Sequence, residues 1–343
     1  MADTMTSTLV EPVRASMLID LEGASTHPKD LRPQESPRAS EVMGIRIEGL
    51  DRSFTAVWLG GRVIGIGSAE VQDGKSPRSK RSFVLQTLAA ALLQPRLQSQ
   101  ASSSVLPNVY LVTPHTSQTI PMLHVLLTKT ISDSSAALEL LKTVRLLQYF
   151  DLAGLAESLA EISQELFQRT HATNMSINPE AGKRTPLKDI VLIQGLGQTM
   201  SATHRRSGLV QSNALLGNLT RNITQISRIS RDVLVLVEVP LEIGTVRDTQ
   251  LYQETAKARR VQAAIEMKSA FAGTHGEALR LCSGHESLAR TLEAALDCIV
   301  VVHDGFGRVK EVGRPNEREE HVVEVVKDRV GDLMGLWGIW KGG

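Results

Sequence analysis

A glycine-containing basic stretch early in the chain has residues that could bind phosphate. Gly74-Lys75-Ser76 matches the end of a phosphate-binding loop, in which backbone N–H groups surround an anion, the lysine reaches the terminal phosphates and the hydroxyl binds a metal ion. The first glycine of that motif is missing, because Ala69 occupies its place, and Pro77 separates the triplet from the helical pattern that follows. The stretch is therefore either a degenerate nucleotide-binding loop or a solvated basic loop.

Other groups with chemical potential have a simpler interpretation. His275 and His285 flank Cys282, but their spacing matches no zinc motif, and we interpret them as unrelated loop residues. No GxSxG sequence indicates a serine hydrolase. Cys282 and Cys298 give neither a metal spacing nor a disulfide framework, which is typical of a reducing intracellular compartment.

Composition limits the classes of function. The 343 residues are 42% hydrophobic and 22% charged, which suffices for one sizeable core. The net charge of +1 gives no global field for nucleic acid or membrane, so any basic surface must be local. No apolar run reaches the ~20 residues that span a bilayer, so we expect a soluble protein without a membrane partner. The Ser-, Thr- and Pro-rich residues 1–42 predict a disordered N-terminal tail, which leaves 43–343 as a single domain.

The elements that must position these residues alternate along the chain. Short apolar runs and amphipathic patterns predict an α/β fold whose parallel sheet is covered on both faces. Strands are predicted at 62–67, 108–113, 144–150, 189–194, 232–239, 298–303, 321–328 and 336–340. Helices are predicted at 83–94, 120–142, around 215–229 and at 249–270. Another helix is predicted to follow Asp151, which serves as its N-cap, and a loop is predicted at 168–188.

The order of these elements resembles a known family. The stretch from Gly44 to Gly67, GIRIEGLDRSFTAVWLGGRVIGIG, looks like the opening of RecA/KaiC-type domains. DIVLIQGLGQTM is similar to that family's second nucleotide strand, and the final HVVEVVKDRVGDLMGLWGIW resembles the closing strands of eukaryotic recombinase paralogues. The resemblance implies a RecA-like P-loop NTPase-type core with a mostly parallel central sheet, helices on both faces and antiparallel C-terminal strands.

The resemblance also implies where nucleotide would bind. The family's helix begins at the phosphate-loop lysine, which gives a second register with Lys80 at the lysine position and Arg81 in place of the hydroxyl. The family's metal-associated Asp corresponds to Gln194, and its water-orienting Glu corresponds to Pro114. Glutamine lacks the charge that a Mg²⁺ site uses, and proline cannot position water. We therefore expect no ATP hydrolysis and no required cofactor, with weak ATP and Mg²⁺ binding as the open alternative.

Two further acidic residues are candidates to replace the missing carboxylates. Glu238 falls where the family has a polar sensor, but its charge is wrong for contacting phosphate. Asp189 begins its strand, far from the crevice expected at the carboxyl ends. Neither residue is expected to restore hydrolysis.

Two basic clusters fall where the family contacts DNA. His204-Arg205-Arg206 is predicted in a loop after the strand that ends at Gln194, where phosphate contacts are expected. A second cluster occupies the place of the family's second DNA loop and comprises Lys257, Arg259, Arg260 and Lys268. Solvated basic surfaces are the alternative for both clusters, and few aromatic residues accompany them.

The resemblance favours a non-catalytic recombinase-paralogue subunit in nuclear DNA repair by homologous recombination. Its expected partners are other RecA-like paralogues or the recombinase itself, with single-stranded DNA as a further candidate. Two alternatives stay open: a weak DNA-dependent ATPase that uses Lys75 or Lys80, and a structural RecA-like subunit of the Elongator complex.

Overall fold

The computed structural model describes residues 45–47, 49–69, 78–98, 106–114, 116–174, 189–245, 264–272, 277–303 and 320–341. The predicted N-terminal tail, 1–42, lies outside these ranges. The described residues all belong to one unit, Val42–Gly343.

The main sheet has eight strands: β1 (Arg62–Ala69), β2 (Asn108–Thr113), β3 (Val144–Gln148), β4 (Asp189–Ile193), β5 (Val233–Glu238), β9 (Cys298–His303), β10 (Glu320–Asp328) and β11 (Trp337–Lys341). Their order is β11-β10-β9-β1-β5-β4-β2-β3. The neighbours from β9 to β3 are all parallel, and β10 is antiparallel to both β9 and β11. This arrangement confirms the predicted mostly parallel sheet.

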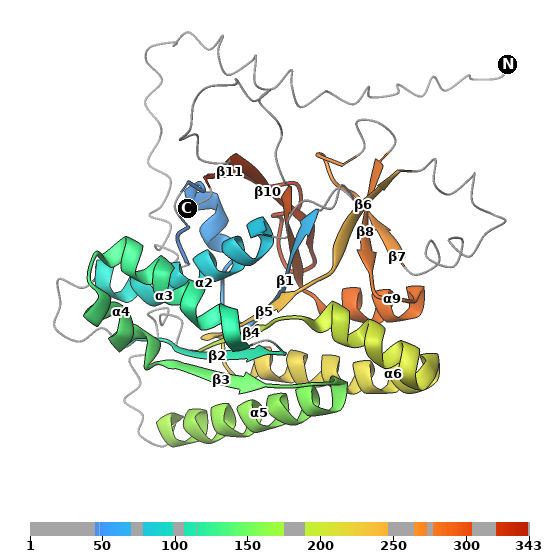
Figure 1. Ribbon diagram of the computed structural model, residues 1–343, viewed down its shortest axis with the longest axis horizontal. Coiled ribbons are helices and arrows are strands. Elements are labelled where there is room, and N and C mark those ends of the chain that lie inside the picture. Colours follow the sequence, from blue (N-terminus) through green and yellow to red (C-terminus); the bar gives the residue numbers. More distant parts are fainter. Residues whose placement is uncertain are drawn as a thin grey trace, which may run out of the picture. The chain divides into compact units, whose positions relative to one another are not determined.

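Helices cover both faces of this sheet (Figure 1). One face packs against α2 (Arg78–Gln98), α3 (Thr116–Ile131), α4 (Ser134–Leu141) and the short η1 (Arg52–Ala56). The other packs against α5 (Leu152–Asn174), α6 (Leu196–Ile229) and α9 (Glu286–Ala295). In β4, Ile190 and Leu192 join the first core while Val191 and Ile193 join the second, which is why that strand shows no apolar–polar alternation. The described chain is a layered α/β fold with a mostly parallel central sheet and antiparallel strands at its C-terminal side.

None of the described helices is both as long and as apolar as a membrane-spanning helix must be.

A second, antiparallel sheet has the order β6-β8-β7 and consists of β6 (Leu241–Thr245), β8 (Glu277–Cys282) and β7 (Ala264–Met267). The chain passes into it close to β1, where a Cβ on Gly67 would lie 2.3 Å from Leu241 Cδ1. Glycine at position 67 therefore makes room for β6.

Several predicted element bounds were wrong. The polar helix predicted at 249–270 is a strand over Ala264–Met267, because pairing with β8 overrides the helix propensity of Ala, Glu and Met. The loop predicted at 168–188 is helical as far as Asn174. The stretch 120–142 forms two helices, α3 and α4, with Asp133 accepting a hydrogen bond as the N-cap of the second. Strands β6 and β8 and helix α9 were not predicted.

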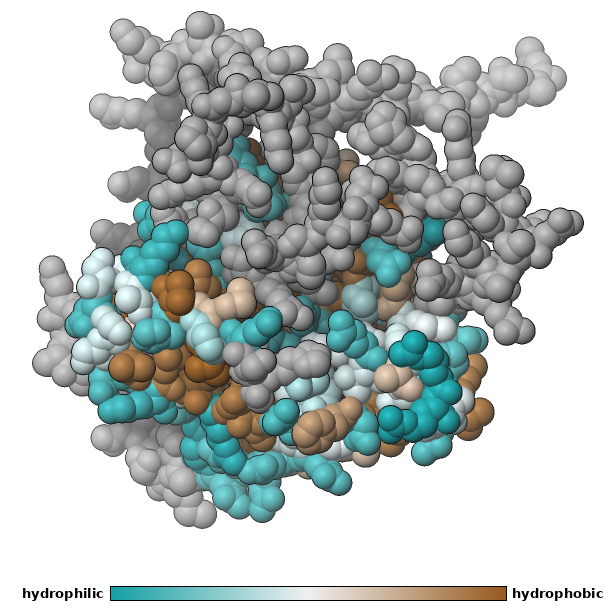
Figure 2. Space-filling view, in the orientation of Figure 1, coloured by the Kyte–Doolittle hydropathy of each residue, from teal (hydrophilic) through white to brown (hydrophobic). Residues whose placement is uncertain are grey.

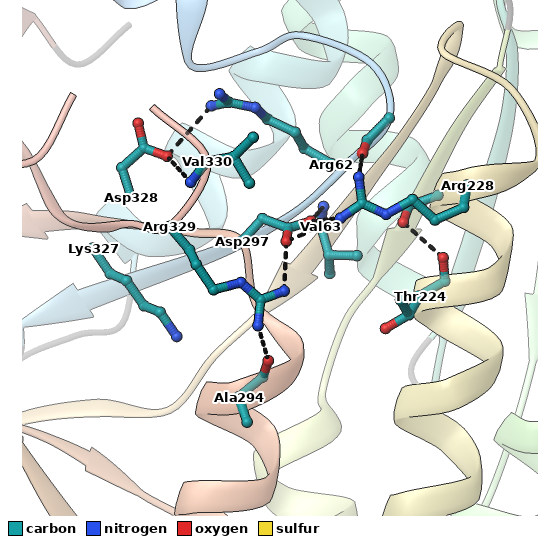
Figure 3. Close-up of polar contacts among 12 residues, drawn as sticks. Arg62, Val63, Thr224, Arg228, Ala294, Asp297, Lys327, Asp328, Arg329 and Val330 are labelled. Carbon is teal, nitrogen blue, oxygen red and sulfur yellow. Dashed lines mark hydrogen bonds and ion pairs between the residues drawn. The ribbon is translucent and has the colours of Figure 1, made fainter. Parts of the chain in front are cut away.

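At the amino ends of β1 and β9, charged side chains tie the elements together (Figure 3). Asp297, whose side chain is 2% exposed, accepts a hydrogen bond from the backbone N–H of Val63 at 3.0 Å. It also accepts from Arg228 at 3.2 Å and from Arg329 at 2.8 Å. The same carboxylate thus links β1, α6 and the segment after β10.

Candidate functional site

The carboxyl ends of the parallel strands bring the candidate site residues to one edge of the sheet. Thr113 ends β2 and Pro114 follows it, Tyr149 follows β3, Gln194 follows β4, and Glu238 ends β5. In an open parallel sheet this edge is where ligands bind. These residues therefore decide what the site can hold.

Gln194 is enclosed in a network of neutral hydrogen bonds. Its side chain is buried, and its amide oxygen accepts a hydrogen bond from Thr119 Oγ1 at 3.2 Å. Its backbone N–H donates to the Val112 carbonyl at 2.9 Å, and its own carbonyl accepts from the Tyr149 hydroxyl. The end of β4 is thus bonded within the protein, and its polar side chain is neutral.

Burial governs the ionisation of the tyrosine in this network. Burial raises the pKa of the Tyr149 hydroxyl well above its usual range, and the negative charge of Glu238 raises that pKa further. Tyr149 therefore acts as a hydrogen-bond donor and supplies no negative charge to a ligand.

Gly195 fixes the turn from β4 into α6. Its φ is +71°, a left-handed conformation in which a side chain is strained, and an added Cβ would lie 2.6 Å from Pro114 Cγ. The packing of Pro114 against this turn explains why the residue after β2 is apolar here. Pro114 packs against this turn, and its ring has no polar group that could orient a water molecule.

Glu238 is the carboxylate that ends β5, and the backbone of the same turn holds it. Its Oε2 accepts a hydrogen bond from the Gly195 N–H at 3.0 Å. A carboxylate at the start of α6 is also favoured by the helix dipole. The sequence placed Glu238 as a doubtful phosphate sensor, but the structure places it as a cap for α6.

In the described part of this edge, the end of β4 offers an amide and no carboxylate to a magnesium ion. Magnesium is held through carboxylates and water, but here the amide of Gln194 accepts from Thr119 and the carboxylate of Glu238 accepts from Gly195. Across the described ranges, no three His, Cys, Asp or Glu side chains come together as metal ligands.

The phosphate-loop residues are only partly described. Gly74, Lys75 and Ser76 lie outside the described residues. Lys80 and Arg81 lie in the first turns of α2, which begins at Arg78, and their side chains are not described. The helix therefore begins near the register that the family resemblance implied, and the role of these residues stays a prediction.

Asp189 lies where its sequence position predicted, at the start of β4 and so at the opposite edge of the sheet. Its Oδ1 accepts hydrogen bonds from Asn108 Nδ2 at 3.1 Å and from Arg169 at 2.7 Å. This carboxylate pairs neighbouring elements and is remote from the carboxyl ends of the strands.

The prediction that the first basic cluster lies in a loop was wrong. His204, Arg205 and Arg206 lie within α6, which runs to Ile229 with a kink at Gly208 (φ 77°, ψ 176°). Arg205 and Arg206 are exposed, whereas the ring of His204 lies 5.9 Å from that of His285. Polar residues suggested a loop because they form the solvent-facing side of a helix whose other side is buried. Of the second cluster, Lys257, Arg259 and Arg260 lie outside the described residues, and Lys268 is exposed just after β7.

The histidines and cysteines of the C-terminal half have separate environments. His285 caps α9, with Nδ1 accepting from the Ser287 N–H at 3.1 Å. Burial raises the pKa of Cys282 to about 12, so its thiol stays protonated. His275 lies outside the described residues.

A second buried polar cluster has no signal in the sequence. Glu324 on β10, 2% exposed, accepts hydrogen bonds from Ser269 Oγ at 2.6 Å and the Ala270 N–H at 2.7 Å, and its Oε2 lies 2.9 Å from His303 Nε2. These contacts join the segment after β7 to β9 and β10. Glu324 sits in the apolar run HVVEVV, and an alternating charge there looks like an ordinary solvent-facing strand residue.

Comparisons with known proteins give a structural likeness. No protein-family model matches the chain, and no curated protein matches it. Among solved structures, the chain resembles one described as the crystal structure of the RadB recombinase, with a TM-score of 0.43 and 12% sequence identity. The likeness covers 82% of this chain and 88% of that one. This degree of likeness says nothing of function.

Proposed function

We propose that this chain is a non-catalytic recombinase-paralogue subunit that acts in DNA repair by homologous recombination through protein contacts. The observation that carries the proposal is the end of β4, where the neutral Gln194 stands at the position that the resemblance assigns to a carboxylate and is bonded to Thr119 and Tyr149. Each lost electrostatic group of this kind costs a factor of ~10² to 10³ in rate. A RecA-like core with this edge is better suited to assembly than to hydrolysis.

The assembly surface that we propose is the outer edge of β3. In the described part of the sheet, β3 is a terminal strand that pairs only with β2. Leu146 on this strand is 39% exposed, and Leu138 on α4 and Val125 on α3 are exposed as well. Figure 2 shows apolar residues gathered over α3, α4 and the strands beneath them. An open strand edge beside apolar side chains favours pairing with another protein.

The proposed partners are other RecA-like paralogues or the recombinase itself, in the nucleus. Single-stranded DNA is a further proposed partner, through the exposed Arg205 and Arg206 on α6. Phosphate contacts by two arginines add affinity without sequence preference. These contacts are secondary to the protein interface in the proposal.

Affinity purification of the tagged chain from nuclear extract tests the proposal. Wild-type protein should recover recombination factors, and Leu146→Arg should lose them because a charge replaces the apolar surface that Leu146 presents beside the β3 edge. Val210→Arg is the matched control, since Val210 is 86% exposed and lies on α6, away from β3. Recovery of no recombination factor, or equal recovery by both variants, would contradict the proposal.

A nucleotide titration tests the non-catalytic part separately. Fluorescent ATP with Mg²⁺ should show no saturable binding to the purified chain. Saturable, Mg²⁺-dependent binding that Lys75→Ala or Lys80→Ala abolishes would support the weak-ATPase alternative instead.

A further inference from the structure

A groove lies between the smaller sheet, α9 and β10. Its volume is about 590 Å³. One wall is β7 with the following Lys268, the other is α9 through Glu286, Arg290 and Glu293, and the floor is Val326 and Lys327 of β10. This groove involves none of the residues at the carboxyl ends of β2, β4 and β5.

The β7 wall presents a strand edge. Five consecutive residues, 264–268, line the groove, although successive side chains of a strand point to opposite faces. The groove therefore follows the backbone of the strand. β7 pairs with β8 on one side and is terminal in its sheet, and within the described ranges no hydrogen bond reaches its outer edge.

Both walls are fixed to the floor. Immediately after β7, Ser269 and Ala270 donate hydrogen bonds to Glu324 of β10, at 2.6 and 2.7 Å. On the other side, Lys327 Nζ donates to the Glu293 carbonyl at 2.6 Å and pairs with the Glu293 carboxylate. A groove whose walls are already held apart binds with less loss of conformational entropy.

The lining indicates what would bind there. Four cationic side chains and three carboxylates face the groove, and three pairs neutralise each other: Arg280–Glu266, Arg290–Glu286 and Lys327–Glu293. Lys268 is left as an exposed cation for which the described residues supply no carboxylate. Ile265, Met267 and Met334 supply apolar surface, and Met334 is 59% exposed.

We propose that this groove binds an extended, acidic peptide segment of a partner protein, which adds as a strand to the outer edge of β7. The backbone edge recognises the extended conformation, the apolar lining takes alternate side chains, and Lys268 pairs with a carboxylate of the peptide. A strand paired with the outer edge of β7 satisfies the backbone groups that this edge leaves open. The proposal does not depend on the proposed recombination function.

A random-sequence peptide display library is the probe. Selection on the full chain should enrich peptides that alternate apolar residues and carry an acidic residue. Their dissociation constants, measured by fluorescence polarisation, should rise at least ~10-fold in Lys268→Glu and in Met334→Asp, a loss typical of one contact at a binding site. Lys129→Glu and Val330→Asp, exposed residues outside the groove, are the matched controls and should change binding less than ~2-fold.

Hydrogen exchange adds a readout specific to strand addition. A bound peptide should slow exchange of the β7 amides, 264–267, and leave those of the α3 helix unchanged. Three results would overturn the proposal: no peptide enriched, binding unaffected by both groove variants, or no protection of β7. A dimer that either groove variant converts to monomer would identify a second copy of the chain as the occupant and would overturn it too.

Discussion

Removal of the Asp297 carboxylate should destabilise the whole domain, because one buried group joins three elements. The side chain is 2% exposed and accepts hydrogen bonds from Val63 N–H, Arg228 and Arg329. Val63 is fully buried in β1, so its N–H has no water to replace the lost acceptor. Arg228 and Arg329 are 50% and 52% exposed and can be solvated.

The magnitude follows from that difference in exposure. In Asp297→Ala, the unsatisfied buried N–H costs about 1–3 kcal/mol. Each ion pair with a half-exposed arginine contributes ~0–1 kcal/mol after screening by water. The expected loss in the free energy of unfolding is therefore about 1–5 kcal/mol. Asp297→Asn keeps an oxygen for the Val63 N–H and loses only the charge, so about 1 kcal/mol is expected.

Urea unfolding followed by far-UV circular dichroism measures these differences, with stability taken from the midpoint when the slope is unchanged. Arg329→Ala should cost about 1 kcal/mol, because Asp297 keeps its other two partners. Asp332→Ala is the matched control, since Asp332 is exposed. The reasoning is refuted if Asp297→Ala costs no more than Arg329→Ala, or if the Asn and Ala variants are equally unstable.

Three further predictions concern ionisation. Despite burial, hydrogen bonds and the nearby His303 lower the pKa of Glu324. The stability that this carboxylate contributes is therefore complete above about pH 4.5 and is lost as the pH falls through the lowered pKa. In Glu324→Gln, the free energy of unfolding should depend less steeply on pH in the acid range, and an unchanged slope would contradict this prediction. Burial raises the pKa of both Cys282 and Cys298 to about 12. Alkylation of these thiols by iodoacetamide at pH 8 should therefore be ~10³-fold slower than alkylation of a free thiol. Rapid labelling of the native protein would be inconsistent with the packing. Burial raises the pKa of Tyr149 well above 10, so this phenol should stay protonated up to pH 11. The rise in absorbance at 295 nm up to pH 11 should therefore be the same in wild type and in Tyr149→Phe. A smaller rise in the variant would show that Tyr149 ionises in the wild type.

Much of the fold was predictable from local patterns. The runs at 108–113 and 298–303 are strands with the predicted bounds, and Asp151 caps α5 by accepting a hydrogen bond from the Gly154 N–H at 2.9 Å. Such elements are encoded by neighbouring residues: an apolar run sized for a buried strand, or a short acceptor before an amphipathic helix. The predicted sheet followed from their alternation.

The elements that failed are those whose partners are distant in sequence. Ala264–Met267 has the composition of a helix, and only pairing with β8 makes it a strand. Arg205 and Arg206 looked like a loop because their polar run is local, while the apolar side of α6 spans many turns. Local propensity is a weak prior when tertiary contacts oppose it.

The sequence by itself determined which groups the candidate site lacks, because residue identity alone decides that Gln194 and Pro114 carry no charge. Only the tertiary structure decided what the groups present do. Glu238 caps the turn at Gly195, and Glu324 joins β10 to the segment after β7. The physical reason is that a carboxylate's role depends on which N–H or O–H donors the fold brings within hydrogen-bonding distance, and those donors are remote in the chain.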